Sequence, residues 1–221
     1  MKSQHKSGDY VLSRSEVQRI YNAPNNFRDR VLIKSFYFSG LRRFEASSLL
    51  VSSVDFNRNV ISVFGKGEKV RSVPIIDPDY RADLYHFVGR KNAGFVFANS
   101  RGESLSDRQI NDIVRLAGSK AEVTHPNPTK ILRKGKLVSR GVSPHLFRHS
   151  IARHMKSDGV PMELIQNFLG HNSINTTVNV YGTLGVSEMQ TILEQKYGEL
   201  PKRLNKSDYK EIDYKIIGGT K

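Results

Sequence analysis

Apolar residues recur every three or four positions through most of this chain, which is the spacing of an amphipathic α-helix. The first such stretch begins at Ser13 and has Glu16 three residues later, the pattern of a capping box at a helix start. Similar stretches follow it, bounded mostly by Gly, Pro, Asn or Asp. Ser106 is expected to cap the helix that begins at Asp107, and Gly170 to close the helix before it as a C-cap. The predicted helices span residues 13–22, 27–39, 42–50, 79–88, 107–118, 144–157, 161–169 and 186–200.

Between residues 51 and 76 the hydrophobic period shortens, and brief runs of Val, Ile and Phe are separated by turn residues. A glycine-flanked turn at Gly65–Glu68 predicts a β-hairpin. The expected antiparallel strands span residues 54–56, 59–64 and 69–75. The pattern therefore predicts a mainly α (α+β) fold, in which a helical domain carries a small antiparallel β-hairpin sheet.

The charge balance is the unusual feature of the composition. The 221 residues include 35 Lys and Arg against 21 Asp and Glu, a formal net charge of +14. A basic surface without a specific partner is one explanation, but clustering of the cations favours a nucleic-acid partner. The chain has no cysteine, which excludes disulfides and thiolate chemistry. It has neither a membrane-spanning apolar run nor a signal-peptide pattern, so a cytoplasmic, DNA-associated protein without membrane contact is expected.

Residues 143–181 concentrate the reactive side chains. His145, Arg148 and His149 have helical spacing that puts them on one face, and His171 and Tyr181 follow. Imidazole transfers protons near neutral pH, arginine binds phosphate and tyrosine can be a covalent nucleophile. The two histidines of the helix could also belong to a zinc site, but no third ligand has metal spacing, so no metal is predicted. The set suits phosphoryl transfer onto tyrosine better than metal-dependent hydrolysis.

These residues, with two earlier motifs, resemble the tyrosine recombinase family, which includes phage integrases and Xer-like proteins. The later part of the match is His-Leu-Phe-Arg-His at 145–149, Leu-Gly-His at 169–171 and a tyrosine ten residues on. The earlier part is Ser-Gly-Leu-Arg-Arg-Phe-Glu at 39–45 and Gly-Lys-Gly-Glu-Lys-Val-Arg-Ser-Val-Pro at 65–74. Each motif alone is weak evidence, but the four occur in the order of the family. The resemblance covers residues 12–195.

The resemblance implies a site-specific DNA recombinase that needs no cofactor. Tyr181 would be the nucleophile, and Lys66 would protonate the leaving oxygen. Of the other implied catalytic residues, Arg42 and Arg148 would neutralise the non-bridging oxygens of the phosphate. His145 would accept or relay the tyrosine proton, and His171 would donate a hydrogen bond to the phosphate. Glu45 lies one turn after Arg42 and could pair with it. Tyr181 follows His171 by one residue more than is usual for the family, so Tyr197, Tyr209 and Tyr214 are kept as alternatives.

Two basic segments are expected to lie on double-stranded DNA. The first is the hairpin, with Arg43 nearby; the second is residues 119–141, which form either a basic loop or β-arm, or a disordered linker. The expected DNA contacts are Arg43, Lys69, Arg71, Lys130, Arg133, Lys134 and Lys136.

The remaining expectations concern organisation and rival functions. Residues 1–200 are expected to form the catalytic domain, and residues 201–221 a basic tail. The resemblance implies a tetrameric assembly on DNA. Residues 186–200 offer an apolar helix face that is expected to lie uncovered by its own chain and to dock on a neighbouring protomer; the alternative is a helix packed back on its own domain. Family members usually carry an additional N-terminal DNA-clamping domain, so this chain is either a piece of a longer protein or a minimal member. The rival functions are a type IB topoisomerase and a DNA-binding protein without catalysis.

Overall fold

The computed structural model describes residues 10–65, 70–89, 91–124, 131–133, 136–138, 141–170 and 186–198. Its helices are α1 (Arg14–Asn22), α2 (Phe27–Phe38), α3 (Arg43–Ser47), α4 (Pro78–Val88), α5 (Asp107–Lys120), α6 (Pro144–Ser157), α7 (Met162–Leu169) and α8 (Val186–Tyr197). Its strands are β1 (Val54–Asp55), β2 (Val60–Phe64), β3 (Val70–Pro74), β4 (Ile131–Arg133) and β5 (Lys136–Val138). The predicted mainly α fold with a small antiparallel sheet is confirmed.

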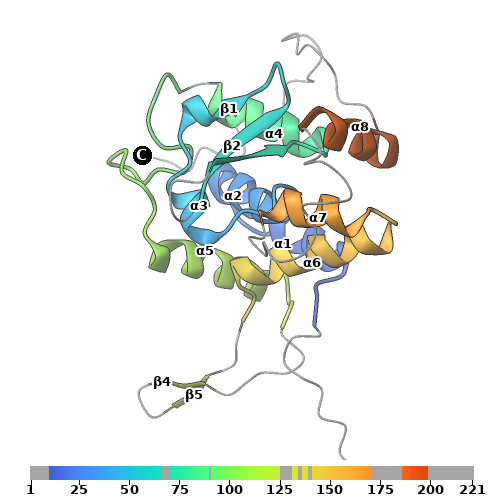
Figure 1. The fold of residues 1–221 in the computed structure, drawn as a ribbon. Helices are drawn as coiled ribbons and strands as arrows, with labels where there is room; N and C mark the ends of the chain where they lie inside the picture. Colours follow the sequence, from blue (N-terminus) through green and yellow to red (C-terminus); the bar gives the residue numbers. More distant parts are fainter. Residues whose placement is uncertain are drawn as a thin grey trace, which may run out of the picture.

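Helix α2 is the centre of the fold, and α1, α4 and α6 pack around it (Figure 1). Because α2 is surrounded, eight of its twelve residues are buried, including Lys34 and Asp29. Lys34 Nζ is compensated by Asp83 Oδ2 of α4 at 2.5 Å, as a buried charge requires a partner. The core continues into α6 and α7 through Phe147 and Phe168, neither of which is exposed to solvent.

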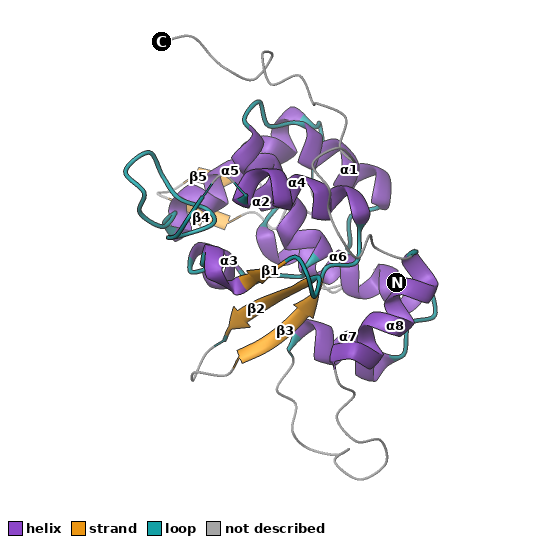
Figure 2. Ribbon diagram, turned by 90° about the horizontal axis from the view of Figure 1, so that it is seen from above, coloured by secondary structure: helices purple, strands orange, loops and turns teal. Residues whose placement is uncertain are grey.

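The three-stranded sheet has the order β1-β2-β3 and lies beside the helices (Figure 2). In its main hairpin Phe64 pairs with Val70 and Ser62 with Ser72. Val63 and Val73 point into the core, whereas Phe64 and Val70 are exposed where β2 ends and β3 begins, next to the segment that joins the two strands. The predicted antiparallel hairpin is therefore confirmed. Its second face is partly covered, since Val60 and Pro74 are also buried and α8 contacts β3.

One predicted helix is shorter in the structure, and one open alternative is decided. The helix expected over 42–50 ends at Ser47, because the backbone after it bonds instead to residues 94–96. Val51 N donates to Gly94 O, and Val96 N donates to Leu49 O. In the segment 119–141, β4 and β5 pair as a two-stranded ribbon (Figure 1). The β-arm alternative is thus confirmed for these two strands.

Helix α8 is packed on its own domain. Met189 and Leu193 are buried, and the Tyr197 hydroxyl donates to Asp158 Oδ2 at 2.7 Å. The expectation that this apolar face lies uncovered is therefore wrong for the chain as it stands here. The reason is that β3 and the end of α6 provide a surface that accepts it, which the sequence pattern of the helix alone does not reveal.

None of the helices in the described ranges is long and apolar enough to cross a membrane. The expected basic tail, residues 201–221, lies outside the described residues.

Candidate active site

Arg148 lies one turn inside α6 and its side chain points into the protein. Only 4% of the residue is exposed, and its two terminal nitrogens donate to the carbonyl oxygens of Gly40 and Leu169. One carbonyl precedes α3 and the other ends α7, so the guanidinium joins three segments that are distant in sequence. Gly40 has φ +56°, and a Cβ there would lie 2.7 Å from the Leu169 side chain. A glycine is therefore required for this close approach.

Arg42 also contacts the end of α7. Its Nη2 donates to Gly170 O at 3.3 Å, the carbonyl next to the one held by Arg148. Its Nη1 donates to Glu45 Oε1 at 2.9 Å, and its backbone N donates to Glu45 Oε2 at 2.7 Å. The predicted Arg42–Glu45 pair is confirmed, and the two arginines implied as catalytic both bond to carbonyls at the end of α7.

Glu45 is the anion at the centre of this cluster. Its side chain has no solvent exposure, and Arg71 from β3 donates to both of its oxygens, at 2.6 and 2.8 Å. Burial alone would raise the pKa of Glu45, but hydrogen bonds from Arg71 and Arg42 outweigh it and hold this pKa below its ordinary value. Glu45 is therefore ionised at neutral pH.

The cluster has more positive than negative charge. Arg42, Arg71 and Arg148 surround a single carboxylate, and burial together with Arg42 and Arg71 lowers the pKa of Arg148 to about 9. Arg148 stays protonated at neutral pH, but its positive charge is only partly compensated. A phosphate group placed here would supply the missing negative charge.

His145 and His149 lie on the outer side of α6. Their Nε2 atoms are 2.7 Å apart, whereas Arg148 between them is turned inward. The expectation that all three share one face holds for the two imidazoles only, since residues one position apart diverge by about 100° around the helix. Burial, His149, Arg148 and Arg42 each lower the pKa of His145. A neutral imidazole can accept a proton, which suits the role that was expected of His145.

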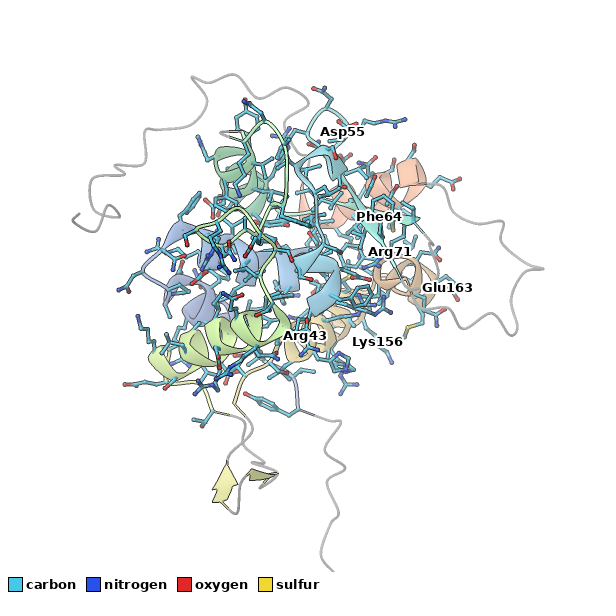
Figure 3. The ribbon with its side chains drawn as sticks, turned by 90° about the vertical axis from the view of Figure 1, so that its left-hand side faces the viewer. Arg43, Asp55, Phe64, Arg71, Lys156 and Glu163 are labelled. Atoms are coloured by element: carbon cyan, nitrogen blue, oxygen red, sulfur yellow. The ribbon has the colours of Figure 1, made fainter. Side chains whose placement is uncertain are left out.

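Other predicted residues are described only in part. Phe64 and Arg71 of the sheet, Arg43 of α3 and Glu163 of α7 lie on the side of the molecule that Figure 3 shows. Arg43 forms an ion pair of 2.7 Å with Asp107 at the surface. Arg133 and Lys136 are paired across β4 and β5. The predicted residues outside the described part are Lys66, Lys69, Lys130, Lys134, His171 and Tyr181.

The chain segment leading to His171 is described, however. Helix α7 ends at Gly170, which has the left-handed conformation, φ 62° and ψ 50°, as predicted for a C-cap. A Cβ at Gly170 would lie 2.5 Å from Cδ of Arg71. The cluster of Arg42, Arg71 and Arg148 therefore borders directly on the residue before His171.

Sequence reasoning missed the pairing of Arg71 with Glu45. Arg71 was expected on the DNA-facing ribbon, but only 14% of its side chain is exposed. The sequence near Glu45 holds no signal for this pairing, because the partner lies 26 positions away on another element. Within the described residues, no group of three or more His, Asp or Glu side chains is arranged to hold a metal ion.

The comparisons with known proteins point to a single family. The family model described as the phage integrase family matches residues 10–186. The tyrosine recombinase XerD of Staphylococcus epidermidis is 29% identical over 197 residues, which cover 84% of this chain and 61% of that protein. The chain thus spans less than two thirds of the length of this relative.

Solved structures give the same result for the fold. The crystal structure of XerA recombinase superimposes with a TM-score of 0.62 at 25% identity, covering 84% of this chain and 64% of that one. The XerH site-specific recombinase, solved bound to its difH substrate before cleavage, has a TM-score of 0.58 at 22% identity. That comparison covers 74% of this chain and 47% of XerH.

Proposed function

This chain belongs to the phage integrase family, and from that premise we propose that it cleaves and rejoins double-stranded DNA at specific sites. The observation that carries the proposal is the meeting of Arg42 and Arg148 at the end of α7, in a cluster with an excess of positive charge. A cluster of this kind suits a phosphodiester, because its guanidinium groups can neutralise the non-bridging oxygens.

The proposed reaction has two balanced steps. The Tyr181 oxygen attacks the scissile phosphorus while the bond from phosphorus to the 5′-oxygen breaks, leaving a 3′-phosphotyrosyl bond and a 5′-hydroxyl. His145 accepts the tyrosine proton, Lys66 gives a proton to the departing oxygen, and His171 donates a hydrogen bond to the phosphate. A 5′-hydroxyl of another strand then attacks the phosphorus and releases the tyrosine. No outside energy source is needed, because one phosphodiester replaces another.

The geometry supports the electrostatic part of this reaction. Arg148 and Arg42 are already held by protein carbonyls and by Glu45, so they need little rearrangement when charge develops on the phosphate. Preorganised donors of this kind usually contribute the largest share of catalysis. A protein that only binds DNA needs surface cations but has no need of a buried arginine cluster. The relatives named above are recombinases, which favours strand exchange over topoisomerase activity.

A covalent trap tests the proposal. The protein would be incubated with a duplex nicked near the cleavage position, so that the short 5′-hydroxyl fragment diffuses away and resealing is blocked. Because the target site is unknown, a library of duplexes would be used. A DNA adduct that survives denaturation is expected, and peptide mapping should place it on Tyr181. Non-covalent binding without any adduct across the library would leave only the DNA-binding rival.

Lys66→Ala should slow cleavage, and sulfur at the 5′-bridging position of the substrate should restore the rate. Sulfur leaves without a proton, so a general-acid defect is hidden on that substrate. Single-turnover rates on the oxygen and sulfur substrates give the comparison. Equal losses on both would show that Lys66 acts in positioning rather than as the acid.

DNA affinity should depend strongly on salt. If roughly five to eight phosphates are contacted, the logarithm of the affinity should fall against the logarithm of salt concentration with a slope of about −4.5 to −7. Fluorescence anisotropy at several salt concentrations measures this slope. The proposed contacts outside the arginine cluster are Arg43, Lys69, Lys130, Arg133, Lys134 and Lys136. A slope near zero would show that the net charge of +14 does not serve to bind DNA phosphates.

Exchange of strands between two sites needs several active sites acting in order, so we also propose assembly into tetramers on paired DNA sites. Helix α8 is covered by its own domain in this structure. A role of the apolar face of α8 in assembly would therefore require the helix first to leave that surface, whereas its solvent side is accessible as it stands.

A further inference from the structure

We propose that Arg71 is a positioning residue, which aligns Arg42 with the end of α7 and with the β2–β3 hairpin for the cleavage reaction. The inference rests on the proposed function and goes beyond it, since the resemblance gave Arg71 only as a phosphate contact. It concerns a residue that acts through others and not on the DNA itself.

The contacts of Arg71 argue against a phosphate contact. Both of its terminal nitrogens donate to Glu45, at 2.6 and 2.8 Å, and its Nε is buried with no hydrogen-bond partner among the described residues. The charge of Arg71 is thereby compensated by a carboxylate that has no solvent exposure, whereas Arg148 is held by neutral carbonyls and keeps its charge for a phosphate. Turning the guanidinium of Arg71 toward a phosphate would break its paired bonds to Glu45. Leaving a buried carboxylate without its partner is strongly unfavourable.

The same contacts make Arg71 the link between separate parts of the site. The two Glu45 oxygens that accept hydrogen bonds from Arg71 also accept hydrogen bonds from Arg42. Oε1 accepts from the Arg42 side chain, and Oε2 accepts from its backbone N. The orientation of Arg42 therefore depends on a carboxylate that Arg71 keeps in place. Because Arg71 belongs to β3, this link also ties the hairpin strand to α3.

The third connection runs to the end of α7. Cδ of Arg71 occupies the space that a Cβ of residue 170 would need, at 2.5 Å, with its Nε at 3.0 Å. Gly170 is the residue whose carbonyl Arg42 contacts, and it directly precedes His171. The Arg71 side chain thus contacts Glu45 of α3 and Gly170 just before His171, while Arg71 itself belongs to the hairpin.

The planar shape of the guanidinium group explains why an arginine is needed at position 71. Its planar guanidinium makes two parallel bonds to one carboxylate, which fixes direction as well as distance. A lysine would keep the charge beside Glu45 but would make a single, freely rotating contact. Arg71→Lys should therefore preserve the fold but lose the alignment of Arg42, whereas Arg71→Met also removes the positive charge beside Glu45.

The test compares cleavage of two substrates by the full chain. The first has an ordinary scissile phosphodiester; in the second, a methyl group replaces one non-bridging oxygen, so the scissile group has no charge. Neutralisation by Arg42 matters for the first substrate and much less for the second. Arg71→Lys should cleave the ordinary substrate about 10- to 100-fold more slowly than the unmodified chain, less than the roughly 100- to 1000-fold loss for removing a donor outright, because Arg42 is misaligned but still present. On the uncharged substrate the difference should shrink to a few-fold.

Three further measurements separate alignment from other roles. DNA affinity and its salt slope should not change in Arg71→Lys or Arg71→Met, whereas loss of a phosphate contact would reduce the slope by about 0.9 in Arg71→Met. Thermal unfolding checks that each variant is folded; if Arg71→Met is not, Arg71→Met combined with Glu45→Gln removes the unpaired charge. Arg58→Met, an exposed arginine after β1, is the matched control and should cleave normally.

Each outcome has a definite reading. A slower rate on the ordinary substrate with rescue on the uncharged one supports the inference. Equal losses on both substrates, a reduced salt slope, or unchanged cleavage by Arg71→Lys and by the folded Met variant would overturn it. If the unmodified chain forms no adduct on either substrate, the proposed function fails first and the inference with it.

Discussion

Arg148→Ala should reduce DNA cleavage by about 100- to 1000-fold, the loss typical of removing a preorganised donor from a transition state. The effect should be on the rate more than on DNA affinity, because only 4% of the residue is exposed and it can meet only the phosphate that enters the cluster. Single-turnover adduct formation on the nicked duplex measures the cleavage rate. Equilibrium binding to a duplex that holds the binding site of one protein molecule measures the DNA affinity.

The same substitution should also destabilise the protein. It leaves the carbonyl oxygens of Gly40 and Leu169 without their donor, and an unsatisfied buried group costs about 1–3 kcal/mol. Arg148→Lys should keep part of the stability but little of the rate, since it cannot bond to both carbonyls and still face a phosphate. Lys156→Ala, on the exposed end of α6, is the control. An Arg148→Ala protein that cleaves within three-fold of the unmodified chain would remove Arg148 from the mechanism.

Tyr181→Phe should abolish the covalent adduct entirely, because no other side chain can replace the lost oxygen as nucleophile. Only a hydroxyl is removed, so DNA affinity should be nearly unchanged. Gel analysis under denaturing conditions detects the adduct, and binding to an intact duplex checks affinity. A persistent adduct would show that another tyrosine attacks.

The structure already weakens one alternative nucleophile. The Tyr197 hydroxyl donates to Asp158 Oδ2 at 2.7 Å, and burial together with Asp158 raises the pKa of Tyr197. A hydroxyl that is tied to a carboxylate and hard to deprotonate is a poor nucleophile. Tyr197→Phe should therefore leave adduct formation intact, which makes it the matched control for Tyr181→Phe. Tyr209 and Tyr214 can be tested by the same peptide mapping.

Elements governed by local rules were predictable from the sequence. Ser13 and Glu16 form the predicted capping box, Ser106 caps α5 as expected, and Gly170 ends α7 in the left-handed conformation. Each of these depends on residues within one helical turn, so the sequence contains nearly all the relevant information. The hairpin itself was predictable from its turn residues, but its register was not: the expected turn at Gly65–Glu68 would pair Phe64 with Lys69, whereas the structure pairs Phe64 with Val70.

Features that depend on distant partners were not predictable in this way. Arg71 and Glu45 are 26 positions apart, and nothing in either local pattern says that they meet. Arg148 was predicted as a site residue from its motif, but its inward direction follows from the carbonyls of Gly40 and Leu169, which belong to other elements. The burial of α8 likewise depends on the surface opposite it rather than on its own apolar stripe.

The packing of α8 also bears on how the protein can be shortened. A chain ended at Thr183 would keep the six proposed catalytic residues but lose Met189 and Leu193, which are buried against the rest of the domain. The surface beneath them would then face water, and such a shortened protein would tend to precipitate or to pair nonspecifically. Its failure to recombine would say little about assembly. Substitutions on the solvent side of α8, such as Gln195→Glu, change the outer surface while leaving the inner one covered, so they are the better probe of contacts between copies.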